Sequence, residues 1–339
     1  MDISMWPKGL MVRVFLSLLL CTPAFSQQEY SEDSAEFIVD DLSSDTQNED
    51  ADPFEKLGIY EVAEQSLTIP QTIATEAELK ATLYAPLLKG TKNELMPVVI
   101  MLPGFSTGQR GYKIYSQHLA SHGFFVLGID FPKSGILYRA RHDENAQQVL
   151  QTLDFLDDKR SPTYGKVDLN YIAAAGHSLG GKIAFYAASL DPRIKVILAM
   201  DPVNSGGAPC FITPKQCAAF PVAPNPKTGD IGRMDQVNSA TLIFRAPRDL
   251  IFNPEVQFNA FHFWNGFKGE GLYLDFRSAK HLSFVRDDVV IKITKRTMLA
   301  WLSRHFRGDG DKMDRYLSPN SGYLSEEIDD DVLATVEVK

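Results

Sequence analysis

The chain has 339 residues, of which 44% are hydrophobic and 23% are charged, and its formal net charge is −9. This length and apolar content allow one large buried core. The negative charge argues against nucleic acid as a partner, because proteins that bind nucleic acid present basic surfaces to its phosphates.

The first 26 residues have the pattern of a secretory signal peptide. Basic residues precede an apolar run at 14–20, and the small residues Ala24 and Ser26 suit cleavage before Gln27. The apolar run is too short to span a membrane. We therefore expect a secreted or periplasmic protein without a stable membrane span.

Two further segments differ in composition from the rest of the chain. Residues 27–57 are acidic and rich in serine, and residues 308–339 contain the run EEIDDD. Such segments bury little apolar surface, so both are expected to be solvated and flexible. The folded domain is accordingly expected at 58–307.

Strand-like and helix-like stretches alternate along that domain. The expected strands are 59–69, 78–84, 97–102, 124–129, 171–175, 193–200, 240–244 and 271–276, and the expected helices are 113–122, 145–156, 182–190 and 291–306. This alternation predicts an α/β fold with a mostly parallel central sheet flanked by helices.

A serine lies between two glycines where a strand gives way to a helix. Residues 176–180, GHSLG, fit the pattern G-x-S-x-G, in which a sharp turn presents the serine hydroxyl above the backbone. The glycines let neighbouring elements approach closely. Ser178 is therefore the candidate nucleophile, and the adjacent His177 is expected to pack under the turn rather than to react.

A serine hydroxyl needs a histidine base to become a good nucleophile. His281 lies in the loop RSAKHLSF, directly after the last expected strand, where an imidazole could reach the serine. His262 lies in the aromatic segment QFNAFHFWNGF and is better interpreted as a packing or substrate-side residue. His305 lies on the last expected helix. We therefore predict His281 as the base.

The base needs an acid to orient it, and the residues leave two candidates. Asp201 directly follows the strand 193–200, and Asp249 follows the strand 240–244. Both strands end at the edge of the sheet that carries Ser178, so either carboxylate could reach the imidazole.

The negative charge that develops on a substrate carbonyl needs backbone N–H donors. In the G-x-S-x-G arrangement, one donor follows the serine and the other comes from the loop after an earlier strand. These are Leu179 and, in the loop LPGFSTG, Phe105.

Two cysteines follow the expected signal peptide. Cys210 and Cys217 lie seven positions apart in a proline-rich segment, and an oxidising compartment would let them form a disulfide. The alternative is a pair of free buried thiols. We identify no pattern that implies a metal ion or a cofactor.

Three segments resemble the chlorophyllases, which are serine esterases of the α/β-hydrolase superfamily. They are GHSLGGKIAF, ASHGFFVLGID and MDPV, and the likeness runs with gaps from about Pro97 to about Val285. The chain is also similar to secreted platelet-activating-factor acetylhydrolases and to cutinases and polyester hydrolases. The resemblance implies an α/β-hydrolase fold and ester hydrolysis.

The resemblance also ranks the two candidate acids. In chlorophyllases the acid is the aspartate of the DPV motif, which corresponds to Asp201. In cutinases and polyester hydrolases it follows the next strand, where TLIFRAPRD places Asp249. We expect Asp201 as the acid and keep Asp249 as the alternative.

Together these features predict a hydrolase of carboxylic esters with an apolar moiety, acting through an acyl-enzyme on Ser178. The alternatives are a polyester or cutin-type hydrolase and an acetylhydrolase-type phospholipase. A fourth possibility, from a different class, is a non-catalytic binding protein with the same fold.

Overall fold

The computed structural model describes residues 52–72, 78–87, 94–105, 107–131, 142–203, 234–247 and 259–339. The chain divides into two units, residues 1–49 and 50–339. All of the described residues belong to the second unit. The signal-peptide prediction, Cys210, Cys217 and Asp249 lie outside the described residues.

A nine-stranded sheet forms the centre of the second unit, in the order β1-β2-β4-β3-β5-β6-β7-β8-β9. Its strands are β1 (Val62–Pro70), β2 (Glu78–Pro86), β3 (Met96–Leu102), β4 (Phe125–Asp130), β5 (Val167–His177), β6 (Ile194–Met200), β7 (Ala240–Arg245), β8 (Gly271–Phe276) and β9 (Leu333–Val338). The strands from β4 to β8 in that order are parallel, and β1, β2 and β9 pair in antiparallel fashion at the two ends.

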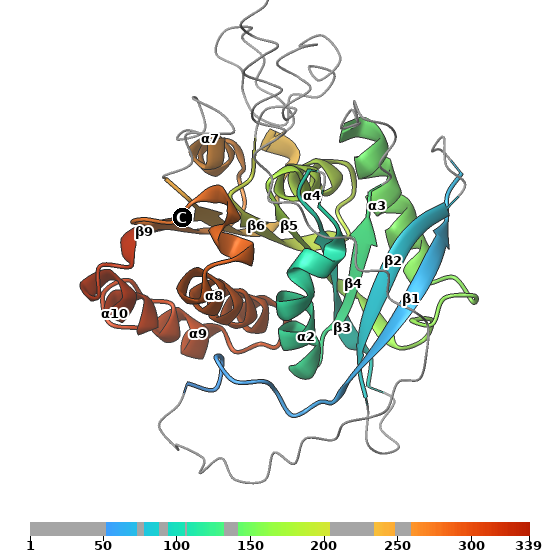
Figure 1. Cartoon of the computed structure of the whole chain (residues 1–339), viewed down its shortest axis with the longest axis horizontal. Helices are drawn as coiled ribbons and strands as arrows, with labels where there is room; N and C mark the ends of the chain where they lie inside the picture. The colour runs from blue at the N-terminus through green and yellow to red at the C-terminus, as the bar shows by residue number, and fades with distance from the viewer. Residues whose placement is uncertain are drawn as a thin grey trace, which may run out of the picture. The chain divides into compact units, whose positions relative to one another are not determined.

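Helices cover both faces of this sheet (Figure 1). They are α2 (Lys113–Ser121), α3 (His142–Leu156), α4 (Leu179–Leu190), α7 (Asn259–Gly266), α8 (Asp288–Phe306), α9 (Gly310–Tyr316) and α10 (Tyr323–Asp329), with 3-10 helices η2 (Gln109–Tyr112), η3 (Met234–Gln236) and η5 (His281–Val285). No helix in the described part of the chain is long and apolar enough to cross a membrane. The predicted α/β class with a mostly parallel sheet is confirmed.

Strand β3 shows why the sequence forms a two-sided core. Its residues Val98, Ile100 and Leu102 belong to the hydrophobic cluster that includes side chains of α3, α4 and α7. The alternate residues, Val99 and Met101, belong to the cluster that includes α2 and α8. Because successive side chains of a strand point to opposite faces, an unbroken apolar strand must be covered on both sides.

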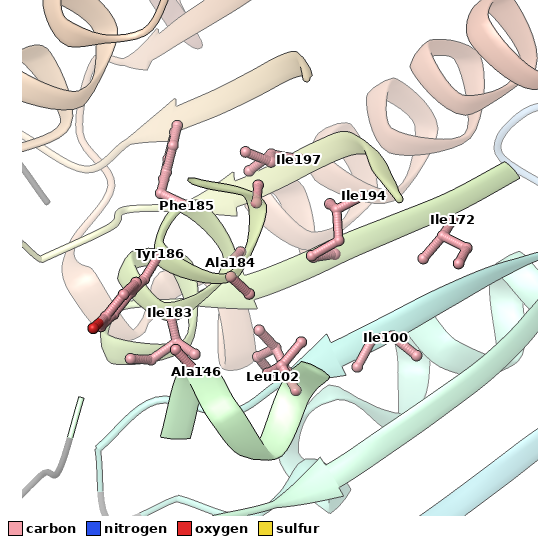
Figure 2. Packing of buried hydrophobic residues seen from close by; sticks show 14 of the residues in the cluster. Ile100, Leu102, Ala146, Ile172, Ile183, Ala184, Phe185, Tyr186, Ile194 and Ile197 are labelled. Carbon is pink, nitrogen blue, oxygen red and sulfur yellow. The ribbon is translucent and has the colours of Figure 1, made fainter. Parts of the chain in front are cut away.

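Helix α4 packs tightly against the centre of the sheet. Figure 2 shows Ile183, Ala184 and Phe185 of α4 together with apolar side chains of β3, β5 and β6, and with Ala146 of α3. Ile183, Ala184 and Phe185 are fully buried. The position of the N-terminus of α4, directly after Ser178, is thereby fixed by core packing.

The direction in which successive strands are added reverses between the neighbouring strands β3 and β5. Strand β4 lies on one side of β3, whereas β5 lies on its other side, followed by β6, β7 and β8. In open α/β sheets, ligands bind at the carboxyl ends of the strands on either side of such a switch point. Here those ends are Leu102 and His177, directly before the two predicted catalytic loops.

The prediction of a flexible tail at 308–339 was wrong. The segment forms α9 and α10 and then β9, which pairs with β8 at the edge of the sheet. The acidic run lies at the end of α10 and in the turn after it, while Tyr323, Leu324 and Leu333 are buried. The prediction relied on the acidic composition of the segment. It overlooked LATVEV, whose alternating apolar and polar residues are typical of a strand.

The predicted boundary at residue 57 was also misplaced. Arg296 of α8 forms an ion pair with Asp52 and lies 3.7 Å from Glu55 and 3.6 Å from Glu327. The hydroxyl of Tyr316 donates to Asp52 Oδ2 at 2.6 Å. A buried guanidinium needs carboxylate partners, so the acidic residues at the start of the described chain are part of the folded unit.

A pair of substitutions in β9 tests whether the C-terminal segment contributes to the fold. Leu333→Ala should lower the free energy of unfolding by about 2–5 kcal/mol, because it removes a fully buried side chain that pairs with β8. Val338→Ala, on the same strand but 60% exposed, should change it by less than about 0.5 kcal/mol. Urea denaturation measures both, and equal effects would contradict an ordered β9.

Candidate active site

Ser178 lies in a sharp turn between β5 and α4. Its backbone angles are φ 55° and ψ −115°, a combination that residues other than glycine rarely adopt. Its N–H donates to the Met200 carbonyl at 2.9 Å, and its own carbonyl accepts from Val203 N–H at 3.2 Å. The strained conformation is therefore held by hydrogen bonds to the end of the neighbouring strand.

The two glycines of the motif are required by close packing. A Cβ on Gly180 would lie 2.2 Å from the Leu102 carbonyl oxygen, and one on Gly176 would lie 2.3 Å from the Gly180 backbone. Either contact is far inside van der Waals distance. The absence of these side chains lets β3, β5 and α4 meet directly beside Ser178.

Asp201 and His281 lie in contact at the same edge of the sheet. Asp201 follows β6 with a positive φ of 42°, and His281 begins η5 shortly after β8. Asp201 Oδ2 lies 2.6 Å from His281 Nδ1, and Asp201 Oδ1 accepts from Ala246 N–H at 3.1 Å. Both side chains are buried.

This contact fixes the position of a proton on the imidazole. An ionised carboxylate only accepts hydrogen bonds, so His281 Nδ1 carries the hydrogen. In the neutral ring Nε2 then keeps its lone pair and can act as a base.

An ion pair supports the strand end beside Asp201. Arg245 at the end of β7 pairs with Asp275, its cross-strand neighbour on β8. Burial raises the pKa of the Asp275 carboxyl, the Arg245 guanidinium opposes this, and the nearby Asp201 raises it further. The pair joins the two strand ends directly before Ala246, whose N–H holds Asp201. Sequence reasoning missed Asp275, because only the register of β7 against β8 brings it to Arg245.

The two expected oxyanion donors lie at two neighbouring strand ends. Leu179 is the first residue of α4, where backbone N–H groups lack intrahelical partners and the helix dipole favours negative charge. Phe105 follows β3 and is half-buried. The preceding Gly104 donates its N–H to the Tyr112 hydroxyl at 3.1 Å.

His177 packs under the turn, as the sequence predicted. It is buried, its Nδ1 lies 2.8 Å from the Tyr112 hydroxyl, and its Nε2 lies 2.8 Å from the His281 carbonyl oxygen. Burial lowers the pKa of this imidazole well below its usual value, and the neighbouring His281 adds to the effect. Sequence reasoning missed Tyr112, since no local pattern links it to the serine.

The aromatic segment around α7 contributes mainly to the core. Phe263 is fully buried and stacks on Phe185 of α4 at 4.7 Å, and Trp264 is also buried. Phe261 is 43% exposed. The histidine considered in this segment, His262, belongs to α7.

The other histidine considered, His305, belongs to α8 and packs its ring on Trp301 at 4.5 Å. The described residues contain no group of three or more histidine, cysteine, aspartate or glutamate side chains that could hold a metal ion.

The chain is similar to several proteins of known activity. Residues 80–208, less than half of the chain, match the family model described as PETase: PET hydrolase-like. A bis(hydroxyethyl) terephthalate hydrolase of Streptomyces coelicolor is 25% identical over 264 residues, which cover 77% of this chain and 72% of that protein.

Two other relatives match over shorter stretches. A cutinase, est1 of Thermobifida alba, is 29% identical over 122 residues, or 36% of this chain and 38% of the cutinase. Chlorophyllase-1 of Citrus unshiu is 29% identical over 147 residues, or 43% of each chain. The resemblance to ester hydrolases is thus confirmed, and the chain has an α/β-hydrolase fold and is a carboxylic ester hydrolase.

Proposed function

We propose that the enzyme hydrolyses esters with a sizeable apolar moiety through a covalent acyl-enzyme on Ser178. The observation that carries this proposal is the 2.6 Å contact between Asp201 and His281 at the edge of the sheet where Ser178 occupies its strained turn. A nucleophile on such a turn and a base oriented by a buried carboxylate are the parts that acyl transfer requires.

In the first half-reaction, Ser178 Oγ attacks the ester carbonyl carbon while His281 Nε2 takes the hydroxyl proton. The backbone N–H groups of Leu179 and Phe105 stabilise the negative charge on the carbonyl oxygen. His281 then gives its proton to the leaving alcohol, and the acyl group remains on Ser178. Asp201 holds the imidazole in one tautomer and stabilises its cationic form without taking the proton.

In the second half-reaction, water takes the place of the alcohol. His281 removes a proton from the water as it attacks the acyl carbon, and returns the proton to Ser178 Oγ as the carboxylic acid leaves. The serine is regenerated, and this sequence requires no cofactor.

The relatives suggest the class of substrate. Their names include a hydrolase of a terephthalate diester, cutinases and a chlorophyllase. All three are ester hydrolases, and we infer that this enzyme also takes an ester, with an apolar moiety. Phe105 would line the acyl side of the site through its half-buried side chain, since only its backbone is needed for the oxyanion.

A polyester or cutin-type activity is the second candidate. It is favoured by the PETase-like match over residues 80–208 and by the terephthalate-ester hydrolase, whose similarity extends over 77% of the chain. Such an enzyme would use the same catalytic groups on a polymer.

We also propose that the enzyme acts outside the cytoplasm after removal of residues 1–26. The basic start, the short apolar run and the small residues before Gln27 support this proposal. Mass spectrometry of protein expressed with its own N-terminus tests it, and export without cleavage after Ser26 would contradict the cleavage site.

The substrate proposal is tested with four esters and one inactive variant. Initial rates are measured on p-nitrophenyl butyrate, bis(hydroxyethyl) terephthalate, a polyester film and chlorophyll a in detergent, with Ser178→Ala as the blank. We expect hydrolysis of the soluble esters to fall at least about 10³-fold in the variant, because the nucleophile is lost. Rates independent of Ser178 would contradict the mechanism. Rapid attack on the film would favour the polyester candidate.

Two matched substitutions test the choice of acid. Asp201→Asn should lower kcat by about 10⁴-fold, because an amide no longer holds the imidazole in the required tautomer. Asp249→Asn should leave kcat within about threefold. Steady-state kinetics on one soluble ester measures both, and the reverse pattern would assign the acid to Asp249.

A further inference from the structure

A chain of hydrogen bonds passes behind Ser178 and joins two loops of the active site. It begins at Gly104 N–H in the loop after β3, continues through the Tyr112 hydroxyl and the ring of His177, and ends at the His281 carbonyl. Its donor–acceptor distances are 3.1, 2.8 and 2.8 Å. His177 is the residue directly before Ser178, so its side chain links the loop after β3 to η5 from the position next to the proposed nucleophile.

The chemistry of the two ends fixes every proton in this chain. The His281 carbonyl can only accept, so His177 Nε2 carries a hydrogen and donates it. In the neutral ring Nδ1 must then accept, so the Tyr112 hydroxyl donates to it. The Tyr112 oxygen in turn accepts from Gly104 N–H. The bonds therefore all run in one direction, from Gly104 to His281, and protonation of His177 would break the central one.

The surroundings hold the chain in this arrangement. Tyr112 is fully buried and His177 is 2% exposed. A Cβ on Gly104 would lie 3.2 Å from the Tyr112 hydroxyl and 3.3 Å from His177 Nδ1, so a larger residue would crowd the junction. The His177 ring also packs against the ring of His281, with centroids 4.5 Å apart. Burial keeps His177 neutral, as the lowered pKa of its imidazole indicates.

We infer that His177 is a positioning residue that couples the oxyanion loop to the general base. The inference rests on the proposed function, in which Phe105 follows Gly104 in the oxyanion loop and His281 is the base. Through Tyr112, His177 fixes the loop that presents Phe105 N–H. Through its own Nε2, it fixes the backbone of His281, whose side chain is held independently by Asp201. The Phe105 N–H and the His281 imidazole both act on the transition state. Loss of the hydrogen-bond chain that positions them should therefore lower kcat more than it changes KM.

The fold provides a matched control in Tyr115. Its hydroxyl also donates to a backbone carbonyl of η5, that of Phe284 at 2.6 Å, and it is also fully buried. The Tyr115 hydroxyl reaches η5 directly through this bond, rather than through the ring of His177. Tyr115→Phe therefore removes an anchor of the same kind from the same segment while leaving the coupling chain intact.

The experiment measures kcat and KM on one soluble ester, and the melting temperature of each protein. The five variants are Tyr112→Phe, His177→Leu, their double variant, His177→Gln and Tyr115→Phe. His177→Leu should lower kcat by about 30-fold or more with KM within about threefold, and Tyr112→Phe by about 10-fold. The double variant should be no slower than His177→Leu, because both changes break one chain.

Two variants separate positioning from simple stabilisation. The amide of His177→Gln can donate to His281 and accept from Tyr112, so it should recover kcat to within about tenfold of wild type. Tyr115→Phe should lower the melting temperature about as much as Tyr112→Phe while changing kcat by less than about threefold.

Several outcomes would overturn the inference. They are an unchanged kcat in His177→Leu, independent and multiplying effects of the two single substitutions, or an equal loss of kcat in Tyr115→Phe. If His177→Leu does not fold, the kcat of Tyr112→Phe tests the inference instead, because this variant removes only one oxygen atom. An unchanged kcat in Tyr112→Phe would then overturn the inference. A wild-type enzyme that neither hydrolyses esters nor reacts with a fluorophosphonate would instead overturn the proposed function itself.

Discussion

The strained turn at Ser178 is the constraint on which the rest of the structure depends. A serine with φ near 55° persists only if its surroundings determine that conformation. The Met200 carbonyl, the Val203 N–H and the buried face of α4 provide those surroundings. The strands β5 and β6, the helix and the two glycines thus act together to place one hydroxyl group at the carboxyl edge of the sheet.

The same edge gathers the other polar groups because the central strands are parallel. Loops that follow β3, β6, β7 and β8 all begin there, although they are far apart in the sequence. Asp201, the Ala246 N–H and His281 meet at this edge and form a buried, hydrogen-bonded set. Asp201 also has a positive φ, so the proposed acid, like the proposed nucleophile, is held in an uncommon backbone conformation.

Local patterns were sufficient to predict the fold class, the turn at Ser178 and the strand ends from which Asp201 and His281 project. Apolar runs and glycine spacing reflect constraints between residues that are close together in the chain, so they can be recognised in a single sequence. The choice between Asp201 and Asp249 could not be made from the residues, because it depends on which strand end faces the imidazole. Tyr112 and Asp275 were missed for the same reason: each meets its partner only through tertiary packing or sheet register.

The two errors at the ends of the domain also have one physical origin. Acidic composition predicted flexible segments, but Arg296 binds acidic residues from both ends of the folded unit, and β9 pairs with β8. Acidic residues usually indicate a solvated segment, but beside a buried cation their carboxylates stabilise the fold. Composition alone contains no information about such a partner.

The central claim is that Ser178 is a nucleophile activated by His281. The most direct measurement is the rate at which a fluorophosphonate labels the wild-type enzyme and His281→Gln, with the modified peptide identified by mass spectrometry. We expect rapid labelling of Ser178 in the wild type and labelling at least about 10²-fold slower in the variant, because the base is lost. Labelling of a different residue, or equal rates in the two proteins, would contradict the account.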